Sequence, residues 1–104
     1  MTESRRHRLE AMLEADPDDQ LLRYMLAMES EKEGNSDRSL QLLSELMRDD
    51  PPYVPAFLMA GQQQARLGRA EEARASYTDG IQSARKQGDV HAAEEMAQFL
   101  QELE

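Results

Sequence analysis

A repeat with a period of 34 residues runs through this chain. Pro17 and Pro51 each lie in an acidic turn, and the two prolines are 34 positions apart. The same offset of 34 residues aligns five further pairs of positions, and at several of them both residues are small. The pairs are Ala27 with Gly61, Gly34 with Gly68, Ser39 with Ala73, Leu43 with Tyr77, and Leu46 with Gly80. A period of this length is typical of repeat proteins in which each unit buries the apolar face of its neighbour.

The pattern within the first unit predicts two helices joined by a short turn. Apolar residues recur at helical spacing over residues 20–33 and again over residues 37–48. Gly34 suits the left-handed position after a helix C-terminus, and Ser36 is expected to cap the second helix. The second helix places one apolar stripe on the core: Leu40, Leu43, Leu46 and Met47.

The second unit follows the same plan over residues 54–67 and 70–86, with its turn at Gly68. Its second helix is expected to face inward at Ala73, Tyr77, Gly80 and Ile81. A glycine inside a helix costs about 1 kcal/mol relative to alanine. We therefore expect Gly80, like Gly61, where two helices approach too closely for a side chain.

Both ends of the chain also carry helical patterns. Residues 3–15 have the apolar spacing of a second helix and predict an incomplete leading unit. Residues 89–103, with Asp89 as N-cap, predict a terminal helix that covers the last apolar face of the array. Arg85 stands where a third proline would fall, so this last helix is expected to follow without the usual turn.

Composition also indicates an all-α fold. The chain contains only two valines and one isoleucine, no tryptophan, three tyrosines and two phenylalanines. Residues that favour strands are therefore scarce, whereas good helix formers such as alanine, leucine, methionine and glutamate are common.

The sequence resembles the tetratricopeptide repeat (TPR) family. The resemblance rests on Phe57, Ala60 and Gly61, and then on Leu67, Gly68, Arg69, Glu72, Ala73, Tyr77, Gly80 and Ile81. The first unit is a degenerate copy, because Arg23 stands where the family usually has an aromatic residue and Ser39 replaces the customary alanine.

The resemblance covers nearly the whole chain and implies a right-handed solenoid of helical hairpins with about six helices. We expect a single domain over 1–104, with an N-terminal half-repeat and a C-terminal capping helix. The expected division is a leading helix at 3–15, repeat one at 20–53, repeat two at 54–87 and the capping helix at 89–103.

Charge and composition narrow the classes of partner. The formal net charge is −9, with 21 acidic and 12 basic residues, which argues against nucleic acid or an anionic membrane as the ligand. The chain has no cysteine, no signal-peptide pattern and no long apolar run. We therefore expect a soluble cytoplasmic protein.

No arrangement of residues predicts catalysis. His7 and His91 are isolated, without the second histidine that a helical zinc site needs. Asp16, Asp18 and Asp19 surround a proline and are typical of a turn followed by a helix cap. The glycine-containing turns match no nucleotide-binding motif. We expect no catalytic residue, no cofactor and no metal.

The resemblance implies that the first helix of each unit lines a concave, partner-binding face. The residues expected there are Leu21, Tyr24, Met25, Met28, Leu58, Met59, Gln62 and Arg66. Such a Met-rich surface suits a flexible apolar groove for a protein or peptide segment, as in an adaptor or scaffold. The family's clamp for chaperone C-termini is not expected, because Tyr24, Met28 and Met59 occupy the matching places.

Two other interpretations of this stripe stay open. The methionines can belong to the core, with the leading helix covering part of the groove. The same patch can also serve a homodimer, as in a self-associating assembly unit, or the client of a small acidic chaperone.

Overall fold

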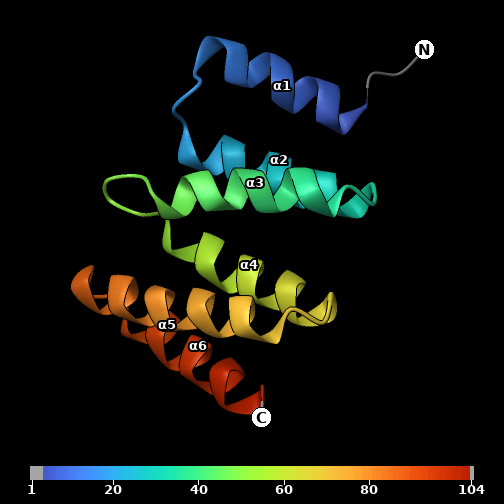
Figure 1. Ribbon diagram of the computed structural model, residues 1–104. Coiled ribbons are helices and arrows are strands. Elements are labelled where there is room, and N and C mark those ends of the chain that lie inside the picture. Colours follow the sequence, from blue (N-terminus) through green and yellow to red (C-terminus); the bar gives the residue numbers. More distant parts are fainter. Residues whose placement is uncertain (1–3, 104) are drawn as a thin grey trace.

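Six α-helices stacked in sequence order make up the described part of the chain, residues 4–103, in a computed structural model (Figure 1). They are α1 (Arg5–Ala15), α2 (Gln20–Lys32), α3 (Ser36–Met47), α4 (Val54–Arg66), α5 (Ala70–Lys86) and α6 (Val90–Glu102). Residues 4–103 include no strand, and no helix among them is long and apolar enough to cross a bilayer. The prediction of an all-α helical solenoid is confirmed; residue 3, expected in the leading helix, lies outside the described residues.

Helices α2, α4 and α5 end in the same way, at a glycine in the left-handed conformation. The φ angles of Gly34, Gly68 and Gly88 are 84°, 77° and 77°. At each turn the backbone N–H of the residue after the glycine donates to a carbonyl five residues earlier, as from Asn35 to Ser30 at 2.8 Å. This arrangement satisfies carbonyls that a helix end leaves without partners. The turn between α5 and α6 is therefore a tight hairpin like the other two.

Side-chain caps begin four of the helices. Ser4, Asp19, Asn35 and Asp89 each accept a hydrogen bond from the backbone N–H three residues later. The expectation that Ser36 caps α3 is wrong, because Asn35 already occupies the capping position directly after Gly34. Its Oδ1 accepts from the Arg38 N–H at 3.1 Å, and Ser36 becomes the first residue of the helix.

Two apolar clusters form the core, and α4 contributes to both. The first joins α1 to α4 and contains Leu9, Leu26, Ala27, Leu42, Leu43, Leu46, Ala56 and Ala60. The second joins α4 to α6 and contains Val54, Phe57, Ala73, Tyr77, Ala84, Ala93 and Met96. Leu42, which the predicted stripe omitted, is buried, whereas Leu40 is only partly buried.

Gly61 and Gly80 lie at the closest approaches between helices, as predicted. A β-carbon on Gly61 would stand 2.3 Å from Cε1 of Tyr77. A β-carbon on Gly80 would stand 2.5 Å from both the Met96 sulfur and the Phe57 Cβ. Glycine at these two positions therefore sets the distance between α4, α5 and α6.

Arg23 connects the first repeat to the loop that follows it. Its guanidinium donates to both carboxylate oxygens of Asp49 and to the Asp18 carbonyl, while the Gln20 amide donates to Asp49 and to the Pro51 carbonyl. The side chains of Arg23 and Asp49 are only 14% and 25% exposed. Where the family usually packs an aromatic ring, this chain has a partly buried ion pair.

This ion pair makes the stability of the protein depend on pH. The hydrogen bonds from Arg23 hold the pKa of Asp49 below its ordinary value of 3.8. A lowered carboxyl pKa adds stability above that ordinary value, and the contribution disappears as the pH falls through the lower pKa of the folded protein.

We expect Asp49→Asn to lower the free energy of unfolding by about 1–2 kcal/mol at pH 7, because it weakens the partner of a partly buried cation. Urea titrations at pH 7 and pH 3 check this, since the difference from wild type should shrink at pH 3. Asp79→Asn, which changes an exposed carboxylate in α5, is the control and should be near neutral. A deficit of Asp49→Asn that is equal at both pH values would contradict the assignment.

Candidate partner-binding surface

One stripe of α2 presents apolar side chains to solvent. Leu21 and Met28 are 56% and 41% exposed, and Tyr24 lies between them, half-buried. The three positions share a helix face because they are three and four residues apart. The Tyr24 ring contacts the Tyr53 ring at a centroid distance of 5.3 Å, and burial raises the pKa of the Tyr24 hydroxyl above its ordinary value of 10.0. Tyr24 is therefore a neutral, partly fixed member of this stripe.

Two of the methionines expected on the surface are half-buried. Met25 of α2 and Met59 of α4 both pack against the first core cluster. They therefore belong partly to the core, and the exposed apolar side chains expected on this surface are mainly Leu21 and Met28. A charged substitution at Met25 or Met59 would therefore disturb the core as well as the surface.

The α4 residues expected on this surface lie in different environments. Leu58 packs partly against the second core cluster, and Gln62 is half-buried. Arg66 is exposed and forms an ion pair with Glu31 of α2. The structure thus connects α2 and α4 at this edge through a charged contact.

A buried polar network holds the same two helices together beneath the surface. The Ser39 hydroxyl donates to the Ala27 carbonyl at 2.7 Å and accepts from the Gln63 amide at 2.9 Å. The Gln63 amide also donates to Glu31 at 3.3 Å. Serine in place of the family's alanine therefore has a structural role, since it links α2, α3 and α4.

A small cavity, here called the socket, opens between α4 and α6. Its volume is about 150 Å³. Apolar side chains form most of the wall and two carboxylates complete it: Val54, Pro55, Leu58, Ala92 and Met96, with Asp89 and Glu95. Of these, Leu58 was predicted from the sequence to lie on the binding surface. The amphipathic pattern of residues 89–103 indicated a capping helix, and nothing in it showed a gap at the contact with α4.

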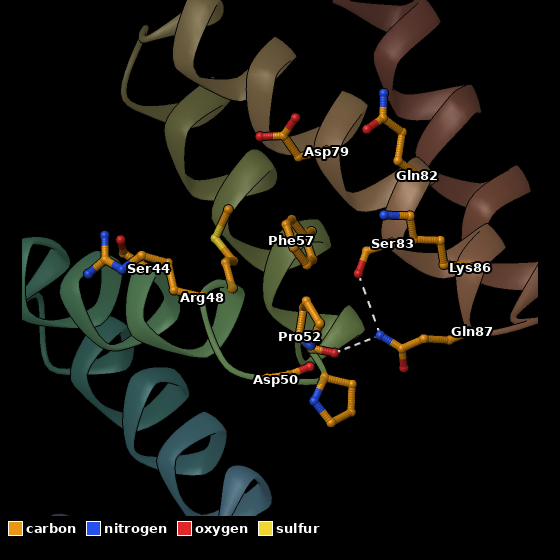
Figure 2. Close-up of a pocket in the computed structure, with 12 residues that line it drawn as sticks. Ser44, Arg48, Asp50, Pro52, Phe57, Asp79, Gln82, Ser83, Lys86 and Gln87 are labelled. Carbon is orange, nitrogen blue, oxygen red and sulfur yellow. Dashed lines mark hydrogen bonds between the residues drawn. The ribbon is translucent and has the colours of Figure 1, made fainter.

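A larger cleft of about 590 Å³ lies between α3, the loop before α4, and α5 (Figure 2). Phe57 lies at its centre, and the Gln87 amide donates to the Pro52 carbonyl at 2.9 Å across one end. Both signs of charge line it, with Arg48 and Lys86 as well as Asp50 and Asp79. Its wall exists because α5 has 17 residues and α3 has 12, so α5 extends past the loop. The only indication of this cleft in the sequence was Arg85, which stands where a third proline would fall.

Ionisable groups show no arrangement suited to metal binding in the described residues. His7 and His91 are both exposed, and within residues 4–103 no three histidine or carboxylate side chains are placed to hold an ion. The acidic turn near Pro17 supplies the α2 cap through Asp19, whose Oδ1 accepts from the Leu22 N–H at 2.8 Å.

Comparison with known proteins identifies the family. No family model matches the chain. A TPR repeat-containing protein of Pseudomonas aeruginosa is 30% identical over 96 residues, which cover 92% of this chain and 91% of that protein. The solution structure of a tetratricopeptide repeat domain protein from Salinibacter ruber has a TM-score of 0.80 and 36% identity, covering 86% of this chain and 90% of that one. The solution structure of a Bordetella parapertussis protein has the same TM-score at 29% identity, covering 98% of this chain and 89% of that one. This chain belongs to the tetratricopeptide repeat family, whose helical arrays generally serve as non-catalytic protein interaction modules.

Proposed function

We propose that this protein is an adaptor or scaffold module that binds a segment of another protein along the surface formed by α2, α4 and α6. The observation that carries the proposal is the exposure of Leu21 and Met28 on α2, the first helix of repeat one, which the family resemblance assigns to the binding face. Leucine and methionine that remain in water on one stripe are favourable to bury.

The energy available from this stripe is sufficient for a reversible complex. Burying one such side chain contributes about 1.5–3 kcal/mol, whereas association costs several kcal/mol in lost translational and rotational freedom. Two or three anchors contribute about 3–9 kcal/mol before that cost, so alone they support affinity in the millimolar range, about −4 kcal/mol, and tighter binding requires hydrogen bonds and further contacts along the surface. An extended segment or one face of a helix both present side chains at suitable spacing.

A matched pair of substitutions tests the proposal. We expect Leu21→Glu to weaken binding of a captured partner by about tenfold or more, because the carboxylate would replace an apolar anchor. Leu67→Glu is the control, since Leu67 is 44% exposed but lies in the turn between α4 and α5. Partners isolated by affinity capture are measured against both variants by calorimetry. Equal affinity for wild type and Leu21→Glu would refute the surface assignment.

A self-associating assembly unit is the alternative, because a second copy could bury the same apolar stripe. Sedimentation of wild type and Leu21→Glu separates the two functions. The adaptor proposal expects both proteins to be monomers at about 100 μM. A wild-type dimer that Leu21→Glu dissociates would favour self-association instead.

A further inference from the structure

We propose that the socket between α4 and α6 receives one apolar side chain of a partner segment that carries lysine or arginine next to it. This inference rests on the proposed function, because it gives the chemical class of the segment bound on that surface. It assigns the partner's specificity to α6, the terminal helix of the array, in addition to α2 and α4.

The size of the socket fits a single aliphatic side chain. A water molecule occupies about 30 Å³ in the liquid, and an apolar cavity of about 150 Å³ can hold a molecule the size of benzene. The socket volume of 150 Å³ therefore accommodates the carbon atoms of a leucine, isoleucine or methionine side chain and excludes a folded element.

The floor of the socket is apolar and packed into the core. Val54 and Met96 belong to the second core cluster and are 6% and 0% exposed. Leu58 and Ala92 pack against the same cluster from α4 and α6. Because these residues are already fixed by the core, an incoming side chain gains contacts without ordering the wall, which lowers the cost of binding.

The negative charge at the rim of the socket favours a basic residue next to the apolar side chain. Among residues 4–103, the ionisable residues that line the socket are Asp89 and Glu95, and both are acidic. Asp89 is held in place as the α6 cap, where its Oδ1 accepts from the Ala92 N–H at 3.1 Å. Within residues 4–103 no ion pair involves Glu95. A lysine or arginine beside the anchor would therefore meet two carboxylates, and none of the described residues that line the socket is a competing cation.

The same charges disfavour the other occupants. An acidic segment would be repelled by the rim and by a chain with net charge −9. A second copy of the chain brings the same net charge of −9, so the two copies repel each other as wholes. A basic, apolar segment of a different protein is the occupant that the site favours.

A positional-scanning library of peptides provides the first test. The purified chain is screened against it, and we expect selection of leucine, isoleucine or methionine at one position with lysine or arginine beside it. In the best peptide, replacing the apolar anchor by serine should weaken binding at least tenfold by fluorescence anisotropy. Selection of acidic neighbours, or no selection at all, would overturn the proposal.

Two substitutions in α6 test the socket itself. Ala92→Leu places extra carbon atoms in the cavity and should weaken the selected peptide at least tenfold. Glu95→Lys reverses one rim charge and should weaken it about fivefold, with the loss reduced at high salt. Glu94→Lys is the matched control, because it makes the same charge change at an exposed position that does not line the socket, and it should stay within twofold of wild type. Circular dichroism melts verify that all three variants remain folded.

The outcomes separate this inference from the proposed function. If Leu21→Glu abolishes peptide binding and Ala92→Leu and Glu95→Lys leave it unchanged, the socket assignment is wrong and the α2 surface stands. If the α6 variants weaken binding and Leu21→Glu does not, the socket stands and the α2 stripe is wrong. A dimer of the free chain that Ala92→Leu dissociates would assign the socket to a second copy and overturn the proposed occupant.

Discussion

Replacing Tyr77 with alanine is expected to lower the free energy of unfolding by about 3–5 kcal/mol, the range for removing a large buried ring. Tyr77 is only 1% exposed, stacks on Phe99 at a centroid distance of 6.0 Å and fills the space that Gly61 leaves open. No neighbouring side chain can fill the cavity left by the missing ring, because the rest of the second cluster holds α4 and α6 apart. Since small domains have only about 5–15 kcal/mol of stability in total, the variant should be close to unfolding at ambient temperature.

Urea titration followed by helical circular dichroism measures this loss. Tyr77→Phe is the control, because the ring remains and the structure gives the hydroxyl no hydrogen bond within residues 4–103. We expect Tyr77→Phe to stay within about 0.5 kcal/mol of wild type. A loss below about 1 kcal/mol for the alanine variant would mean that the ring does not hold α4, α5 and α6 together.

The helices and their turns could be predicted because their signals are local. A glycine in the left-handed conformation and a capping side chain act within a few residues, so Gly34, Gly68 and Asp89 are recognisable in the sequence. The repeat then extends these signals to packing, since a glycine recurring in a helix indicates a close contact. Gly61 and Gly80 were placed correctly for that reason. The predicted cap of α3 was wrong by one residue, because Asn35 and Ser36 are adjacent polar residues and either type can cap a helix.

The candidate site was less predictable because it depends on contacts between helices distant in the sequence. Helical spacing puts Met25 and Met28 on adjoining parts of one surface, and only the packing of neighbouring elements makes Met25 half-buried and Met28 exposed. The pairing of Arg23 with Asp49 requires the path of the loop before α4. The socket requires the angle and distance between α4 and α6, which Gly80 and Met96 set together.

Gly80→Ala is the second substitution with a large expected effect, and two opposing terms decide its sign. Alanine favours the helix over glycine by about 1 kcal/mol, which alone would stabilise α5. However, the added β-carbon would lie 2.5 Å from the Met96 sulfur and 2.5 Å from the Phe57 Cβ. Met96 has a flexible side chain that can shift, but the Phe57 Cβ is fixed to the backbone of α4 and cannot move without it.

Overpacking of this kind costs about 1–3 kcal/mol and sometimes more. Here one neighbour is the Phe57 Cβ, which is fixed to the backbone, and the other is Met96, which is fully buried. We therefore expect Gly80→Ala to be destabilising by about 2 kcal/mol net, in the same urea titration. Ala75→Gly, at an exposed position of α5, measures the propensity term alone and should cost about 1 kcal/mol. If Gly80→Ala were instead stabilising by a similar amount, α4 and α5 would not approach as closely as described. Because Val54 and Leu58 of α4 and Met96 of α6 also wall the socket, a displacement of α4 should weaken the lysine-flanked peptide in parallel with the loss of stability.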